Sequence, residues 1–405
     1  MIDQVAYVAM HTSPLALPGT GNAGGMNVYL DELARTMAGR GIEVTIFTRS
    51  VDEDTPELVE VVPGYRLATL RAGPPAEIPT DCLAPFVGEF ADELVKWASI
   101  HGADFDVVHS HYWLSGQVGV IVKKELGIPL ANSFHTLGRV KDAARHPDEA
   151  SSSPVRLLAE EDVIAASDCV IASTPYEFDD LLTHYRARPE RLCVSPPGID
   201  HDVFFPGDRG EARRRLGIDG APIVLFVGRL QRHKGPDVAV DAHALLVERV
   251  ADAELVLVGG PSGRDGDATL ELLEERIAAH GTGEQVRFVP AQPHPAIADW
   301  FRAADVLIMP SRSESFGLVA AEAQACGLPV VASRVGGIPH IVKDAESGIL
   351  VDDHRPDDLA AALEAVITSP SFRADLSAGA VRFARRFSWS ATADRLLELY
   401  AGIVG

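Results

Sequence analysis

Short apolar runs alternate with longer helical patterns along almost the whole chain, and this rhythm limits the possible folds most strongly. Near the start, the apolar run Val5 to Met10 precedes a helical pattern from about Met26 to Gly39, which a strand pattern follows at Glu43 to Thr48. Strands joined by helices pair in parallel, because each helix carries the chain back across one face of the sheet. The rhythm predicts an α/β fold with doubly wound sheets.

The alternation predicts two separate sheets. The first series continues through further apolar runs at Val107-Val108, Ile128 to Leu130, Cys169 to Ala172 and Leu192 to Val194. The second series has strand patterns at Ile223 to Val227, Glu254 to Val258, Val286 to Val289, Val306 to Met309, Val330 to Ala332 and Gly348 to Val351. Turn formers and bulky apolar residues between the two series, at Ser195 to Asp208, indicate an ordered linker. We therefore predict two Rossmann-like domains, residues 1–197 and 198–387, with ligands in the cleft between them.

The charge of the chain excludes several kinds of partner. Its 405 residues include 36 Lys and Arg against 58 Asp and Glu, which gives a formal net charge of -22. Such a chain repels nucleic acid and acidic membrane surfaces. An anionic substrate needs a local cluster of cations and helix N-termini that works against the overall field.

Neither a metal site nor a membrane segment is indicated. The four cysteines, Cys82, Cys169, Cys193 and Cys326, lack the spacing of metal ligands, so we expect reduced, packed thiols. The N-terminus shows no signal-peptide pattern, and no apolar run reaches about 18 residues. We expect a cytoplasmic protein that requires no cofactor or metal.

A glycine-rich loop, Gly19 to Asn27, lies between the first strand and the first helix of the predicted sheet. Glycines there allow backbone N–H groups to approach a phosphate or a sugar closely at a helix N-terminus. The spacing is not GxGxxG, which disfavours a dinucleotide such as NAD. A simple flexible turn is the alternative interpretation of this loop.

Two cations follow the first strand of the second domain. Arg229 and Lys234 lie five residues apart in the segment Phe226 to Gly235, just past the strand end. Arg229 could grip a diphosphate through a bidentate fork, and Lys234 could bind it as a point charge. The alternative is a solvated basic turn, but the place at a strand's carboxyl end favours a binding function.

The segment Pro310 to Gly327 carries the strongest signal. A polar turn follows the strand, and a helix is predicted from near Phe316 to Ala325, so that its N-terminal amides face the cleft. Glu314 lies before this helix and Glu322 within it, and both carboxylates can accept hydrogen bonds from sugar or ribose hydroxyls. A surface position for Glu322 is the alternative, but its alanine neighbours indicate a buried helix, where an unpaired carboxylate would be costly.

These motifs together resemble the retaining glycosyltransferases of family 4, which have the GT-B fold. The resemblance is carried by Gly24-Gly25-Met26-Asn27, Gly228-Arg229, Lys234-Gly235, Glu314 to Glu322 and Gly336-Gly337-Ile338-Pro339. Within the family, the chain looks most like the members that begin mycothiol synthesis by glycosylating inositol 3-phosphate. That closer likeness rests on His11 to Leu15, His109 to Gly119, Gly259 to Gly263 and Phe387-Ser388-Trp389. We expect helix 388–405 to pack back on the first domain.

The resemblance implies roles in donor binding. Arg229 and Lys234 would neutralise the diphosphate of a UDP-sugar, and Glu322 would hold its ribose. Glu314 would hold the sugar, GlcNAc or glucose, and His135 would contact it near the reacting centre. The other implied donor contacts are the amide of Gly25, the strand end at Arg287, and the backbone of Phe316, Gly317, Leu318 and Val319. The catalytic set implied by the family is Arg229, Lys234, Glu314 and His135.

The resemblance also implies an acceptor site. Tyr112, Thr136 and Arg156 match positions that surround the acceptor phosphate, and Asn27 and Lys141 would lie beside them. The related enzymes add a lysine before a Leu-Pro-Thr sequence, whereas the corresponding segment here, Gly73 to Thr80, is shorter and has none. The acceptor therefore stays open between inositol 3-phosphate, another sugar phosphate such as fructose 6-phosphate, and a neutral sugar such as fructose.

Other interpretations differ in whether a second substrate is needed. A UDP-sugar epimerase would act on the nucleotide sugar alone, and a nucleotide-sugar sensor would bind it without turnover. The set Arg229, Lys234, Glu314 and Glu322 favours a transferase, in which electrostatic stabilisation of the leaving diphosphate is the main contribution. The partners that we expect are a nucleotide sugar and a small acceptor, and the oligomeric state is open between a monomer and a homodimer.

Overall fold

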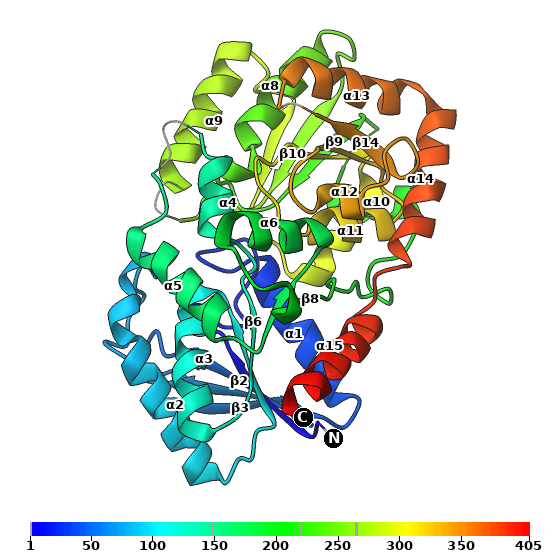
Figure 1. Ribbon diagram of the computed structural model, residues 1–405. Coiled ribbons are helices and arrows are strands. Elements are labelled where there is room, and N and C mark those ends of the chain that lie inside the picture. Colours follow the sequence, from blue (N-terminus) through cyan, green and yellow to red (C-terminus); the bar gives the residue numbers. More distant parts are fainter. Residues whose placement is uncertain (1, 147–149, 219, 264–265, 353) are drawn as a thin grey trace.

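Two largely parallel sheets, each covered by helices on both faces, form the core of the protein (Figure 1). The computed structural model describes residues 2–146, 150–218, 220–263, 266–352 and 354–405. The prediction of two doubly wound α/β domains is confirmed. None of the helices in these described ranges is both long and apolar enough to cross a membrane.

The first sheet has the strand order β3-β4-β2-β1-β5-β6-β7-β8. Its strands are β1 (Gln4–Val8), β2 (Glu43–Arg49), β3 (Leu58–Val62), β4 (Tyr65–Leu70), β5 (Val107–His111), β6 (Leu130–Ser133), β7 (Cys169–Ala172) and β8 (Leu192–Val194). Neighbours pair in parallel, apart from the antiparallel pair of β3 and β4 at one edge. That edge pair is not part of the predicted alternation.

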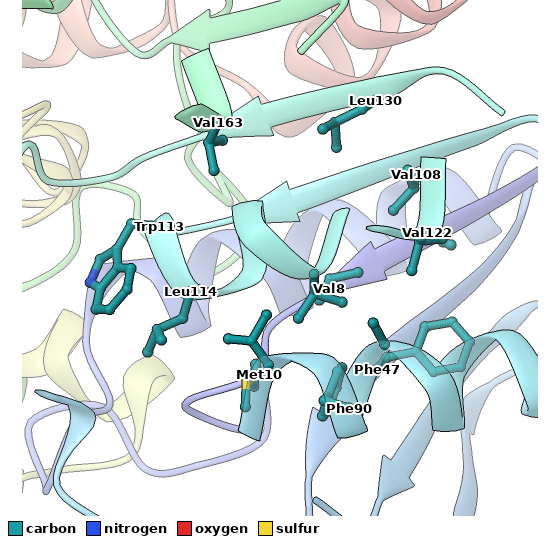
Figure 2. Packing of buried hydrophobic residues seen from close by; sticks show 14 of the residues in the cluster. Val8, Met10, Phe47, Phe90, Val108, Trp113, Leu114, Val122, Leu130 and Val163 are labelled. Carbon is teal, nitrogen blue, oxygen red and sulfur yellow. The ribbon is translucent and has the colours of Figure 1, made fainter. Parts of the chain in front are cut away.

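Both faces of the first sheet are buried, because successive side chains of a strand point to opposite faces. In β1, Ala6 and Val8 contribute to a core with Phe47 and Phe90 under α2 and α3, part of which is drawn in Figure 2. Val5 and Tyr7 face the opposite layer, where α1 and α15 lie. Burial of a large apolar side chain contributes about 1.5 to 3 kcal/mol, so both layers stabilise the sheet.

The helices around this sheet are α1 (Gly25–Ala38), α2 (Val87–His101), α3 (Trp113–Leu126), α4 (Gly138–Ala143), α5 (Pro154–Ala166), α6 (Pro175–Tyr185) and α15 (Trp389–Val404). Short 3-10 helices occur at η1 (Thr80–Cys82), η2 (Ala84–Phe86) and η3 (Pro189–Arg191).

The second sheet has the order β11-β10-β9-β12-β13-β14, with parallel neighbours throughout. Its strands are β9 (Ile223–Val227), β10 (Glu254–Val258), β11 (Val286–Val289), β12 (Val306–Met309), β13 (Val330–Ser333) and β14 (Gly348–Val351). The surrounding helices are α7 (Arg209–Leu216), α8 (Pro236–Val247), α9 (Gly266–His280), α10 (Ile297–Ala303), α11 (Leu318–Ala325), α12 (Ile338–Ile341), α13 (Pro356–Thr368) and α14 (Pro370–Ala384), with η4 (Arg232–Lys234) and η5 (His294–Ala296).

The chain crosses between the two sheets twice, and the crossings touch. After β8, Phe204 is already packed in the core of the second domain. After α14 the chain returns, and α15 covers the first sheet beside α1, as the red and blue helices of Figure 1 show. At the crossings, the Thr392 hydroxyl donates to the carbonyl of Pro196 at 2.8 Å. A Cβ at Gly198 would lie 2.1 Å from the backbone nitrogen of Trp389, so only glycine permits this approach.

The strand orders determine where a ligand can bind. In the first sheet the order reverses beside β1, and in the second it reverses beside β9. Loops that follow strands on either side of a reversal diverge and leave a crevice at the carboxyl ends of the strands. The loops after β1, β5 and β6 face those after β9 and β12 across the space between the domains.

Candidate active site

A cavity of about 560 Å³ lies between the carboxyl ends of the two sheets. Loops of both domains line it, as the doubly wound topology predicts. Most of the predicted site residues meet there: Gly25, Tyr112, His135, Thr136, Lys141, Arg156, Arg229, Lys234, Glu314, Phe316, Gly317, Leu318, Val319 and Glu322.

Asn27 and Arg287 lie elsewhere. Asn27 is buried in α1, where its amide nitrogen donates to the Thr12 hydroxyl and the Ser13 carbonyl, and its oxygen accepts from the N–H of Gly24. It braces the glycine-rich loop and has no donor left for an acceptor molecule. Arg287 is on the edge strand β11, where its half-exposed guanidinium lies 3.8 Å from Glu254. Asn27 is held by these local contacts, and Arg287 lies on the exposed edge of the sheet beside Glu254.

Arg229 follows β9 and lines the cavity. Its guanidinium lies against Gly24, where a Cβ would come 3.3 Å from Nε. Burial lowers the pKa of Arg229, although Glu314 partly opposes this shift. In the described part of the chain, its side chain has no hydrogen bond or ion pair. A cation withdrawn from water without a partner favours an anionic ligand.

Lys234, at the end of η4, differs from Arg229 because it is already paired. Its Nζ lies 2.5 Å from Oε2 of Glu314, in the loop after β12. The pair brings together the residues expected at the diphosphate and at the sugar. A diphosphate that enters beside Lys234 would share this cation with Glu314.

Two helix N-termini point at the cavity. The helix α11 begins at Leu318, two residues later than predicted, because Gly317 adopts a left-handed conformation with φ 99°. The N-cap residues of both helices, Gly24 of α1 and Gly317 of α11, have no side chain that could accept from the first turn, so first-turn N–H groups are open to a ligand. The positive end of each helix dipole adds to Arg229 and Lys234 in attracting an anion.

The motif Gly336-Gly337 supports the loop that carries Glu314. A Cβ at Gly336 would lie 2.1 Å from the carbonyl oxygen of Glu314, and one at Gly337 would lie 2.0 Å from that of Ser315. The N–H of Gly337 donates to the Glu314 carbonyl at 2.8 Å. The two glycines therefore fix the backbone of the loop that carries Glu314 by direct contact, which only residues without a Cβ allow.

His294 is a cavity residue that the sequence prediction did not include. Its Nε2 lies 2.7 Å from Oε1 of Glu322, which is 7% exposed. Burial alone would lower the pKa of His294, but the charge and hydrogen bond of Glu322 outweigh it and raise the pKa overall. The sequence feature that could have identified His294 is its place after β11, at the carboxyl edge of the sheet.

The predicted acceptor residues form one cluster in the first domain. The Arg156 guanidinium stacks over the ring of Tyr112 at 5.1 Å and donates to the Thr136 carbonyl at 3.0 Å. Its Nε also donates to Glu160 at 2.8 Å, so the charge of Arg156 is partly balanced. Lys141 adds a cation to the lining, which also includes Thr80, the last residue of the shortened segment without a lysine, and the adjacent Asp81.

His135 joins the two domains at the reacting side of the cavity. Its backbone is left-handed with φ 59°, which is uncommon for a residue other than glycine, and its carbonyl accepts from the Ser315 hydroxyl of the second domain at 2.5 Å. Burial lowers the pKa of His135 to about 4. The imidazole is therefore neutral at physiological pH. A second contact between the domains runs from the Ser262 hydroxyl to the Gly21 carbonyl.

Within the described ranges, no group of three or more His, Cys, Asp or Glu side chains could hold a metal ion. The four cysteines are free of disulfide bonds. The expectation that the site works without a metal stays a prediction.

Sequence comparison relates the chain to glycosyltransferases over almost its whole length. Residues 23–203 match the family Glycosyltransferase Family 4, and residues 208–382 match Glycosyl transferases group 1. The D-inositol 3-phosphate glycosyltransferase of Thermomonospora curvata is 45% identical over 415 residues, covering 99% of this chain and 96% of the relative. D-inositol 3-phosphate glycosyltransferase 1 of Catenulispora acidiphila is 44% identical over 408 residues, with the same coverage.

Solved structures agree with the architecture. The sucrose-phosphate synthase of Thermosynechococcus elongatus has a TM-score of 0.91 and 31% identity, covering 99% of this chain and 98% of that one. HepE of Anabaena, solved in complex with UDP and glucose, has a TM-score of 0.78 and 19% identity, covering 99% and 100%. At that lower identity the likeness concerns the fold alone.

Proposed function

Because the chain belongs to glycosyltransferase family 4 and is a retaining hexosyltransferase, we propose that it transfers GlcNAc or glucose from UDP to a small phosphorylated polyol or sugar. Inositol 3-phosphate is the acceptor that we favour. The observation that carries the donor part is Arg229, which has no hydrogen bond or ion pair among the described residues and lines the cavity together with the N-termini of α1 and α11.

The donor would lie along the second domain. Arg229, Lys234 and the N-terminus of α11 would surround the diphosphate, where negative charge develops as the bond to the sugar breaks. Glu322, oriented by His294 at 2.7 Å, would accept hydrogen bonds from the ribose hydroxyls. Glu314 would hold the sugar while Lys234, now 2.5 Å away, turns toward the phosphate.

The chemistry follows from this arrangement of charges. As the sugar becomes oxocarbenium-like, the acceptor hydroxyl attacks from the face that UDP leaves, and the leaving phosphate oxygen takes the hydroxyl proton. The new bond joins the acceptor oxygen to the anomeric carbon, and UDP departs with the electron pair. Water must be excluded so that transfer outruns hydrolysis. The hydrogen bonds of Ser315 and Ser262 to the first domain link the two domains beside the cavity.

The acceptor assignment rests on the cluster around Arg156. Tyr112, Thr136 and Arg156 come from three different segments and meet at one wall of the cavity. Relatives about 45% identical over the full chain are D-inositol 3-phosphate glycosyltransferases, which supports inositol 3-phosphate. The missing lysine weakens the phosphate contact by about 1.5 to 3 kcal/mol, the worth of a hydrogen bond to a charged group.

Glucosyl transfer to fructose 6-phosphate or fructose is the second candidate. It is favoured by the likeness to sucrose-phosphate synthase, at 31% identity and a TM-score of 0.91. Both candidates predict a phosphate near Arg156 when the acceptor is phosphorylated, so substrate specificity must separate them.

A donor-by-acceptor screen tests the proposal. UDP-GlcNAc, UDP-glucose and GDP-sugars are incubated with inositol 3-phosphate, fructose 6-phosphate, fructose and inositol, and the anomeric configuration of each product is read by NMR. UDP-sugars incubated without an acceptor should stay unchanged, because free epimerised product would instead identify an epimerase. Binding without any turnover would identify a sensor.

The phosphate site has its own matched pair of variants. Arg156→Ala should raise the KM for a phosphorylated acceptor about 10- to 150-fold while the KM for the UDP-sugar changes little. Arg139→Ala is the control, because Arg139 also stacks on a tyrosine, Tyr185, at 5.1 Å but does not line the cavity. Equal use of phosphorylated and neutral acceptors, unaffected by Arg156→Ala, would show that no phosphate site exists.

A further inference from the structure

A second histidine lies directly behind His135 and has no role in the function proposed above. His111 is the last residue of β5, is fully buried and does not line the cavity. Its Nδ1 lies 3.0 Å from Nε2 of His135, and the two ring planes differ in direction by 26°. His135 therefore turns one ring nitrogen away from the cavity and keeps only Nδ1 for a ligand.

The surroundings leave His111 no other hydrogen-bond partner in the described part of the chain. The neighbouring His109 is fully occupied, because its Nδ1 bonds to the Tyr400 hydroxyl at 2.6 Å and its Nε2 to the Ser133 hydroxyl at 3.0 Å. The Nε2 of His111 is buried without a partner. Among the described residues, the bond to His135 is thus the one polar contact that orients the His111 ring. His111 is in turn the one hydrogen-bond partner recorded for Nε2 of His135 among the same residues.

Burial lowers the pKa of both imidazoles, so each ring is neutral and carries one proton. A hydrogen bond between the two facing nitrogens, 3.0 Å apart, requires that one of them carries its proton and the other does not. Two arrangements are then open. If His111 carries its proton on Nε2, a buried N–H donor lacks an acceptor. If it carries the proton on Nδ1, only a lone pair is left without a partner. Orphaned buried N–H groups are the rarer of the two in proteins, which favours the second arrangement.

We propose that His111 is a positioning residue that donates its Nδ1–H to Nε2 of His135, and so holds His135 as the tautomer whose Nδ1–H faces the donor sugar. The inference rests on the proposed function, in which His135 contacts that sugar. The backbone of His135 is already fixed by its left-handed conformation and by the Ser315 hydroxyl, so the ring torsion is the freedom that His111 removes.

The tautomer determines what the cavity can recognise. A neutral ring with Nδ1–H donates a hydrogen bond to a hydroxyl oxygen of the hexose, whereas the other tautomer would accept one. A neutral donor also adds no positive charge beside the anomeric carbon, where an oxocarbenium-like centre develops. A flipped or rotated ring would misplace this contact, and misplacement by about 1 Å can cost about 100-fold in rate.

Two amide variants of His111 separate hydrogen bonding at Nδ1 from mere filling of space. Asn places its amide near the position of Nδ1, and Gln places an amide of the same chemistry near Nε2. We expect His111→Asn to keep turnover within about threefold of wild type, and His111→Gln to lower kcat about 10-fold or more with little change in the KM for the UDP-sugar. Equal kcat values in the two variants, with both folded and still stabilised by UDP, would overturn the proposal.

A spectroscopic measurement tests the tautomer without relying on turnover. The 15N chemical shift of an imidazole nitrogen reports whether it carries a proton, and His135→Gln identifies the signals of that residue in the histidine-labelled chain. We expect a protonated Nδ1 and an unprotonated Nε2 for His135, a pattern that is lost in His111→Gln. Protonation at Nε2 of His135 instead would refute the assignment. If no donor and acceptor pair reacts, the proposed function fails, while this measurement still decides the state of the histidine pair.

Discussion

Arg229 allows a sharp test, because its contribution to ligand binding and its contribution to folding are expected to have different sizes. The guanidinium has no hydrogen bond or ion pair among the described residues, and burial lowers its pKa. Replacing it with Met removes a cation that folding has partly desolvated, so the free energy of unfolding should stay within about 1 kcal/mol of wild type. Turnover should fall about 100- to 1,000-fold, which is the effect of removing one hydrogen-bond donor that stabilises negative charge in the transition state.

Binding of UDP connects the two quantities. Loss of a charge-assisted hydrogen bond worth about 1.5 to 3 kcal/mol weakens the Kd about 10- to 150-fold. At a UDP concentration of about 100 times the wild-type Kd, wild type gains about 2.7 kcal/mol of stability, whereas Arg229→Met gains about 0.3 to 1.4 kcal/mol. Chemical denaturation with and without UDP, together with calorimetric titration, measures both values.

Arg302→Met is the matched control in the same domain. Arg302 donates to the carbonyls of Val203 at 2.6 Å and Phe205 at 3.0 Å, and it does not line the cavity. Its loss should destabilise the fold by about 1 to 3 kcal/mol and leave the stabilisation by UDP unchanged. The reasoning is refuted if Arg229→Met unfolds as easily as Arg302→Met while UDP still stabilises it fully.

Three further outcomes are expected. Lys234→Ala should lower turnover about 100-fold or more, because it removes a cation from the leaving diphosphate; a wild-type rate in the folded variant would contradict its role. Activity should survive EDTA, and loss that Mg²⁺ or Mn²⁺ restores would reveal a metal requirement. The pKa of His294 is raised above 6.5 in the folded state, so its pairing with Glu322 stabilises the fold fully below pH 6.5 and this contribution is lost as the pH rises through the folded pKa. The stability difference between wild type and His294→Asn should therefore shrink with rising pH, and a difference that grows would have the wrong sign.

The sequence predicted the second sheet almost residue by residue, and the reason is physical. Apart from the edge strand β11, its strands are buried on both faces, so they read as nearly continuous apolar runs between turns, as at Ile223–Val227 and Val306–Met309. The strands β3 and β4 were missed, because an antiparallel edge pair interrupts the strand–helix rhythm and Leu58–Val62 is mostly half-exposed. The rhythm therefore reports the parallel core of a sheet better than its edge.

The site followed from the sequence wherever a residue comes directly after a central strand. Arg229 and Glu314 satisfy this condition, and both line the cavity. Asn27 is predicted to bind the acceptor, but in the structure its amide contacts the backbone at the start of α1, a local use that sequence cannot separate from ligand binding. The pairing of Glu322 with His294 joins helix α11 to the short helix η5 and depends on tertiary contacts that no local pattern records.

The return of the chain to its first domain has a consequence for biosynthesis. Tyr400 in α15 packs beneath the first sheet and bonds to His109, while Trp389 of the same helix contacts Tyr29. Roughly 200 residues separate β8 from this helix, and at about 5 to 20 residues per second the ribosome needs about 10 to 40 seconds to make them. During that interval, the face of the nascent first domain around Tyr7 and His109 lacks its covering helix. That face is where we expect a chaperone to bind while the remainder of the chain is being translated.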